Sequence, residues 1–170
     1  ETALALAGGR GFTSGLVNLD AALPLALADA LGVRFRLLPE ILASRTNLRV
    51  LEPDDKEVIR AGSLYVAPPD YHLLIEPEGK ISYSYAEPVN YSRPAVDVLF
   101  DSIATAAGRN AAAALLTGMG KDGAAGLANI KAAGGFTVAQ DEESSVVFGM
   151  PKAAIEMGGV ENIATLLKMP

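Results

Sequence analysis

A single carboxylate in a glycine-rich run is the residue of this sequence best placed to do chemistry. Asp122 lies in the run Thr117-Gly-Met-Gly-Lys-Asp-Gly-Ala-Ala-Gly-Leu127, between Gly120 and Gly123. Glycines at these positions allow positive φ angles or the close approach of another backbone. The aspartate has two roles open to it, and they are compatible. It can cap the helix that follows, or it can orient an imidazole in a Ser-His-Asp triad.

The composition excludes several other kinds of site. The chain has no cysteine, which excludes disulfides, thiolate zinc sites and a cysteine nucleophile. Its one histidine, His72, cannot form a multi-histidine metal site, and we expect it to be a partly buried structural residue rather than a displaced base. A net charge of −6 without a Lys/Arg cluster argues against a nucleic-acid partner. Lys121 lacks the spacing of a Walker phosphate loop and is expected to be solvated.

The elements that must position Asp122 alternate between strands and helices in the second half of the chain. This rhythm predicts an α/β fold, with a doubly wound, mostly parallel sheet and helices on both faces. Asp122 would then lie at the carboxyl edge of the sheet, where ligands bind in such folds. Pro94 is expected in the first turn of its helix. The expected strands are 111–116 and 136–140, and the expected helices are 96–107, 122–133 and about 151–157.

The first half of the chain has shorter elements. Tyr71-His-Leu-Leu-Ile75 and Ile81-Ser-Tyr-Ser-Tyr85 flank Pro77-Glu-Gly79, which predicts an inserted β-hairpin. No internal repeat or linker interrupts the chain, so we expect one domain over residues 1–170. The other expected strands are 3–7, 48–51 and 63–67, and the other expected helices are 16–23 and 37–45.

The sequence holds four ordered motifs, which are Leu64-Tyr-Val-Ala-Pro-Pro-Asp-Tyr-His-Leu73, Ser92-Arg-Pro-Ala-Val-Asp-Val-Leu-Phe100, and the runs 116–127 and 138–151. Together they resemble the catalytic domain of the CheB-type chemoreceptor methylesterases. The resemblance covers most of the chain and is strongest from Leu48 onward. It implies a single methylesterase-type domain, with no receiver domain within residues 1–170, the same α/β fold, and hydrolysis of glutamyl methyl esters on chemoreceptors. Glutamine deamidation is a related reaction.

The resemblance also implies partners and a location. The chain would act in the cytoplasm on a methyl-accepting chemoreceptor, without inserting into the membrane. A receiver domain and the receptor methyltransferase are further candidate partners. The resemblance implies no metal and no organic cofactor.

The resemblance assigns roles to individual residues. Asp122 falls on the triad aspartate and Met119 on the methionine near the oxyanion site, while Phe148-Gly-Met-Pro151 would help to wall the cleft. The slot of the nucleophilic serine falls on Gly9, and the slot of the histidine falls near Asp29. Only the aspartate of the triad is therefore matched.

Two hydroxyls near Gly9 are weak alternative nucleophiles. Thr13 and Ser14 lie in Gly11-Phe-Thr-Ser-Gly15, but we expect them to cap a helix that begins at Gly15. A serine hydroxyl is a poor nucleophile without an adjacent base, and losing a triad member costs several orders of magnitude in rate. An impaired homologue that binds a receptor or partner is therefore an alternative. A nucleotide or small-molecule binder is a third reading, and it rests on the glycine turns alone.

Overall fold

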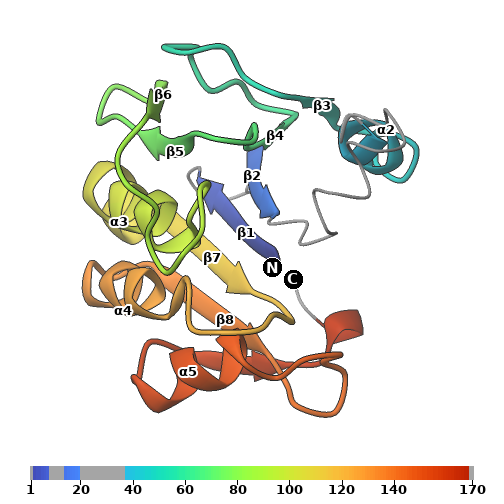
Figure 1. The fold of residues 1–170 in the computed structure, drawn as a ribbon, viewed down its shortest axis with the longest axis vertical. Helices are drawn as coiled ribbons and strands as arrows, with labels where there is room; N and C mark the ends of the chain where they lie inside the picture. Colours follow the sequence, from blue (N-terminus) through green and yellow to red (C-terminus); the bar gives the residue numbers. More distant parts are fainter. Residues whose placement is uncertain (1, 8–13, 20–36, 169–170) are drawn as a thin grey trace.

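A sheet of seven strands runs through the molecule, in the order β3-β4-β2-β1-β7-β8-β9 (Figure 1). The computed structural model describes residues 2–7, 14–19 and 37–168. Within them, β1 is antiparallel to both of its neighbours, and every other pairing in this sheet is parallel. The α/β class and the mostly parallel sheet are confirmed. The strands are β1 (Thr2–Ala7), β2 (Ser14–Leu19), β3 (Arg49–Leu51), β4 (Ser63–Val66), β7 (Ala111–Leu115), β8 (Phe136–Gln140) and β9 (Asn162–Ala164).

Three helices lie in a row on one side of the sheet, and each packs against the next (Figure 1). They are α3 (Val96–Ala107), α4 (Ala124–Ala132) and α5 (Met150–Glu156), while α2 (Leu37–Ala43) lies apart from them beside β3. Short 3-10 turns span Gly108–Asn110 and Leu166–Lys168. None of the helices in the described part of the chain is long and apolar enough to cross a membrane.

The core between these helices and the sheet explains why α3 is fixed in place. The apolar residues Leu99, Phe100 and Ile103 recur on one face of α3 and are fully buried. They pack in one cluster with Leu115 of β7 and Leu127 of α4. Burial of each such side chain stabilises the fold by about 1.5–3 kcal/mol. The first turn of α3 is therefore held firmly over the end of β7.

The inserted strands β5 (His72–Ile75) and β6 (Ile81–Ser84) pair antiparallel in a separate two-stranded sheet. The Gly79 N–H donates to the Glu76 carbonyl oxygen at 2.8 Å and closes the turn between them. Gly79 has φ of 73°, which favours glycine. The Ile75 N–H donates to the Ser102 hydroxyl at 2.9 Å, which ties the pair to α3.

Some elements differ from the expectation. The segment expected to be a helix at 16–23 begins as β2, because residues 14–19 pair with β1 and β4. A short apolar run does not distinguish a helix from a buried strand, and the pairing decides. The α3 helix begins at Val96, so Pro94 lies outside its first turn. Strand β9 was not expected, because an edge strand of three largely exposed residues has no apolar pattern.

Candidate active site

Asp122 lies in the loop between β7 and α4, at the carboxyl end of β7, and it is almost completely buried, with 1% of its surface exposed. Four N–H groups donate to its carboxylate. Oδ1 accepts from the N–H of Asp97 at 3.0 Å, the N–H of Gly123 at 3.0 Å and the Asn90 side-chain amide at 3.1 Å. Oδ2 accepts from the Val96 N–H at 2.7 Å. The loop thus places a carboxylate against the N-terminus of α3, where the helix dipole favours a negative charge.

Asp122 does cap a helix, but the helix is α3 and not the one that follows it in sequence. The capping position of α4 is held by Gly123, which has no side chain. Asp97 of α3 supplies the missing acceptor, since its Oδ1 accepts from the Gly126 N–H at 2.7 Å. The cap of α3 is Ala95, which also has no capping side chain. Each helix therefore depends on a carboxylate from outside its own sequence to satisfy its first N–H groups.

Asp97 is half-buried, and burial raises its pKa above the usual value. Repulsion from the nearby Asp122 and Asp101 carboxylates acts in the same direction. The Gly126 N–H and the Asn90 amide oppose the shift, because they donate to the charged form. The site therefore holds two carboxylates close together, and the N–H donors around them offset part of their repulsion.

Two glycines allow the close packing that this arrangement needs. A Cβ at Gly123 would lie 2.5 Å from Val96 Cγ1 and 2.7 Å from Leu115 Cδ1, and its φ of 84° is left-handed. A Cβ at Gly126 would lie 2.5 Å from Phe100 Cβ. The predicted use of glycine for positive φ or close approach is confirmed at Gly123 and at Gly120, whose φ is 94°, whereas the close contact at Gly126 was not predicted. Without both glycines, α4 could not come near enough to α3 for the exchanged caps.

Met119 lies on a loop that is fastened to the segment before α5. The Gly118 carbonyl accepts from the N–H groups of Gly149 at 3.1 Å and Met150 at 2.9 Å, and the Gly118 N–H donates to Val147. A Cβ at Gly149 would lie 2.6 Å from the Gly118 oxygen, so the two segments are in contact. The Met119 side chain is 77% exposed. The loop backbone is therefore fixed while this side chain remains available to a ligand.

Comparison with known proteins identifies the family. The family model for the CheB methylesterase matches residues 14–170. The chain belongs to the CheB methylesterase family. It is 50% identical over 141 residues to protein-glutamate methylesterase/protein-glutamine glutaminase 1 of Hahella chejuensis, covering 81% of this chain and 39% of that protein. It is 42% identical over 179 residues to the enzyme of Photorhabdus laumondii, covering 99% of this chain and 51% of that protein.

A solved structure agrees with this assignment. The chain matches the crystal structure of the Thermotoga maritima CheB methylesterase catalytic domain with a TM-score of 0.72 and 39% sequence identity. The match covers 75% of this chain and 69% of that one. The chain spans about half, or less, of the length of the curated CheB-family relatives described above.

His72, the one histidine of this CheB-family chain, is fully buried and held by two hydrogen bonds. The Ala95 N–H donates to Nδ1 at 3.1 Å, and Nε2 lies 3.1 Å from the Glu87 carbonyl oxygen. A backbone N–H can only donate, so Nδ1 accepts and the proton resides on Nε2. Neither nitrogen is left with a lone pair that could take a proton from a nucleophile. This supports the expectation that His72 is structural, and it is more buried than predicted.

Of the nucleophile candidates, the structure describes only Ser14. The serine slot Gly9, the alternative Thr13 and the histidine slot near Asp29 lie outside the described residues. Ser14 is the first residue of β2, so the expected helix from Gly15, and with it the capping role of Ser14, is wrong. Lys121 is exposed, as expected. The structure brings Asp122 together with residues that the sequence did not single out as site residues.

Three polar residues near the site were missed. Asn90 and Asp97 contact Asp122 directly, whereas buried Gln140 holds the Met119 loop by accepting from the Thr117 N–H at 2.8 Å. Asp97 stands inside the quoted Ser92–Phe100 motif, where a helix-surface aspartate is unremarkable. Gln140 ends a strand and could have been suspected as a buried polar residue at the carboxyl edge. No local signal pointed to Asn90.

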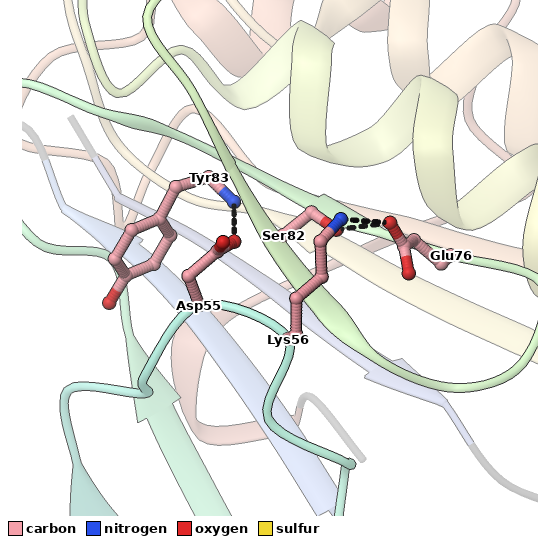
Figure 2. A network of polar contacts seen from close by, with 5 residues as sticks. All are labelled: Asp55, Lys56, Glu76, Ser82 and Tyr83. Carbon is pink, nitrogen blue, oxygen red and sulfur yellow. Dashed lines mark hydrogen bonds and ion pairs between the residues drawn. The ribbon is translucent and has the colours of Figure 1, made fainter.

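A second polar cluster lies at the opposite end of α3. Lys56 Nζ is 2.5 Å from Glu76 Oε1 and 3.0 Å from the Ser82 hydroxyl, and the Tyr83 N–H donates to Asp55 at 2.9 Å (Figure 2). The hydrogen bond with Glu76 raises the pKa of Lys56, and the hydrogen bond from Lys56 lowers the pKa of Glu76. These contacts join the loop around Lys56 to the hairpin. Within the described residues, no group of acidic, histidine or cysteine side chains could hold a metal.

Proposed function

We propose that this chain acts as a protein-glutamate methylesterase domain, which hydrolyses glutamyl methyl esters on a chemoreceptor and deamidates glutamine as a related reaction. The observation that carries the proposal is the buried Asp122 carboxylate at the carboxyl end of β7, fixed by four N–H donors. That is the environment required of a carboxylate that orients an imidazole during acyl transfer. The curated relatives carry the name of this activity.

Each element of the site has a place in this proposal. Oδ1 of Asp122 accepts three of the four donors and Oδ2 accepts one, so within the described residues Oδ2 is the oxygen with capacity left for a partner N–H. Met119 would contact the ester beside the oxyanion. Of the described residues, none accepts a hydrogen bond from the Met119 N–H, which suits an oxyanion donor. The nucleophile would come from the segment around Gly9, Thr13 and Ser14.

A second candidate function has a specific observation in its favour. His72 is the one histidine of the chain, and both of its ring nitrogens are engaged. A domain without a histidine base would hydrolyse esters very slowly. Such a domain could still bind the receptor, a receiver domain or the receptor methyltransferase through the loops around Asp122 and Met119. The relatives' names give this alternative no support.

Methanol release and receptor binding, measured on one preparation, separate the two functions. A methylesterase releases methanol from methylated receptor in proportion to the amount of this chain. A binding module retains the receptor without releasing methanol. Asp101→Asn is a suitable control for substitutions at Asp122. Asp101 is an exposed α3 carboxylate that binds the Asn129 amide at 2.7 Å and does not contact Asp122. The proposal fails if the folded wild-type chain releases no methanol above a protein-free blank.

A further inference from the structure

A tight turn holds Asn90 against the two carboxylates of the site. Val89 and Ser92 exchange backbone hydrogen bonds of 3.1 and 2.9 Å across it. Asn90 and Tyr91, its two central residues, have φ angles of 52° and 65°. Positive φ at both positions is typical of a type I′ turn, which glycine and asparagine favour. A tyrosine there is a strained choice, and such strain persists only where the surrounding structure imposes it.

The Asn90 side chain connects Asp97 and Asp122. Its Nδ2 atom lies 2.8 Å from Asp97 Oδ2 and 3.1 Å from Asp122 Oδ1. A side-chain amide has two N–H donors, so each carboxylate can receive one. No other described side chain donates to both carboxylates. Tyr91, the next residue, is fully exposed and contributes no hydrogen bond to either carboxylate among the described residues.

We propose that Asn90 is a positioning residue for Asp122, whose amide fixes the carboxylate so that Oδ1 keeps its three donors and Oδ2 keeps capacity for the N–H of a catalytic partner. The inference rests on the proposed function, in which Asp122 orients a partner N–H. Oδ1 receives Asn90 together with the N–H groups of Asp97 and Gly123, and it has no room for a further donor. Rotation of the carboxylate would break all three contacts. The amide also donates to two neighbouring carboxylates that would otherwise repel each other.

A hydrogen-bonding role and a purely space-filling role for Asn90 predict different pH dependences of stability. The groups that face Asp97 are the carboxylates of Asp122 and Asp101, the Gly126 N–H and the Asn90 amide. Removing the amide takes away a donor to the charged form, so the pKa of Asp97 rises further. The variant should then lose more stability at neutral pH, where Asp97 is ionised, than in acid. A packing defect alone would cost the same at both pH values.

The test uses two substitutions in the same turn. Asn90→Gly removes the amide and keeps a residue that accepts positive φ, whereas Tyr91→Gly relaxes the turn and keeps the amide. The 13C resonances of the Asp97 and Asp122 carboxyl groups are followed by NMR, with Asp97 titrated by pH. Urea unfolding is measured at about pH 3, below the usual carboxyl pKa values, and at about pH 7.5, well above them. Methanol release gives kcat and KM separately.

We expect Asn90→Gly to raise the Asp97 titration midpoint, to move the Asp122 carboxyl resonance, and to lose more stability at neutral pH than in acid. Its kcat should fall at least about tenfold, as for a lost transition-state contact, with little change in KM. Asn90→Asp, which puts a third carboxylate in place of the donor, should be worse. Tyr91→Gly should leave the Asp97 midpoint unchanged.

Two results would overturn the positioning role. One is an Asp97 midpoint and an Asp122 resonance that are the same in Asn90→Gly as in the wild type. The other is an equal fall in kcat for Asn90→Gly and Tyr91→Gly. A wild-type chain that releases no methanol would count against the proposed function alone. The NMR and unfolding measurements would still decide whether Asn90 holds the carboxylates.

Discussion

Asp97 and Asp122 exchange caps between two helices. Asp122, just before α4, accepts from the first N–H groups of α3, while Asp97, in the first turn of α3, accepts from the Gly126 N–H of α4 at 2.7 Å. The exchange joins the position of the candidate catalytic carboxylate to the packing of α3 on α4. Substitutions that alter this packing should therefore shift the Asp122 carboxylate, even when the substituted residue does not contact it.

Asp97→Ala removes the cap of α4 and should lower the free energy of unfolding by about 1–2 kcal/mol. The Gly126 N–H would lose its acceptor in a half-buried place, and the Asn90 amide would lose one of its two partners. Urea unfolding at neutral pH measures the loss. Asp101→Ala, on an exposed part of the same helix, should change stability by no more than about 0.5 kcal/mol. Equal effects of the two substitutions would show that the exchanged cap is unimportant.

Gly126→Ala should destabilise the protein by about 1–3 kcal/mol, although alanine is the better helix former. The added Cβ would meet Phe100 Cβ at 2.5 Å and force α4 away from α3. The exposed neighbour Ala125 provides the matched comparison, since Ala125→Gly should cost only the helix propensity of about 1 kcal/mol. Thermal unfolding of both variants suffices. A stabilised Gly126→Ala protein would contradict the close packing.

Tyr83 should titrate late, with a pKa of about 12, because burial and the carboxylates of Asp54, Glu52 and Asp55 disfavour its phenolate. Its hydroxyl donates to the Pro53 carbonyl oxygen. Unfolding exposes a phenol with the ordinary value of 10, so the folded state binds the proton more tightly between these values. Stability contributed by Tyr83 is complete below about pH 10 and is lost as the pH rises toward 12.

An ultraviolet titration of tyrosine ionisation, compared with Tyr83→Phe, measures this directly. The phenylalanine variant should lack the latest-titrating group and should lose less stability over the alkaline range. If the two proteins titrate and unfold alike, the Tyr83 phenol is not shielded as described.

The sequence predicted the second half of the fold well and the site only in part. The runs at 111–116 and 122–133 have clear apolar patterns bounded by glycine, and both elements are found within two residues of the expected ends. The helix predicted at 16–23 is wrong, because a short apolar run fits a helix or a strand until pairing with β1 and β4 decides. An apolar pattern predicts a local element, but it does not show which strands that element pairs with in the sheet.

The contacts of Asp122 show the same limit. Its position at a glycine turn predicted a cap, which is correct, but the helix that it caps begins 26 residues earlier in the sequence, at Val96. Asn90 was missed because its role depends on a turn with two positive φ angles. The dipeptide Asn-Tyr does not predict such a turn. Exchanged caps and bridging amides are properties of two segments together, so neither segment reveals them alone.

The most direct test of the account is the rate of methanol release from methylated receptor by the wild-type chain and by Asp122→Asn, each corrected for its folded fraction. The near-isosteric amide cannot accept from all of the same N–H groups, and it carries no charge to stabilise an imidazolium or its substitute. The account predicts measurable release by the wild type and a fall of at least about 100-fold in kcat for Asp122→Asn. Equal rates in the two proteins, or no release by the wild type, would contradict it.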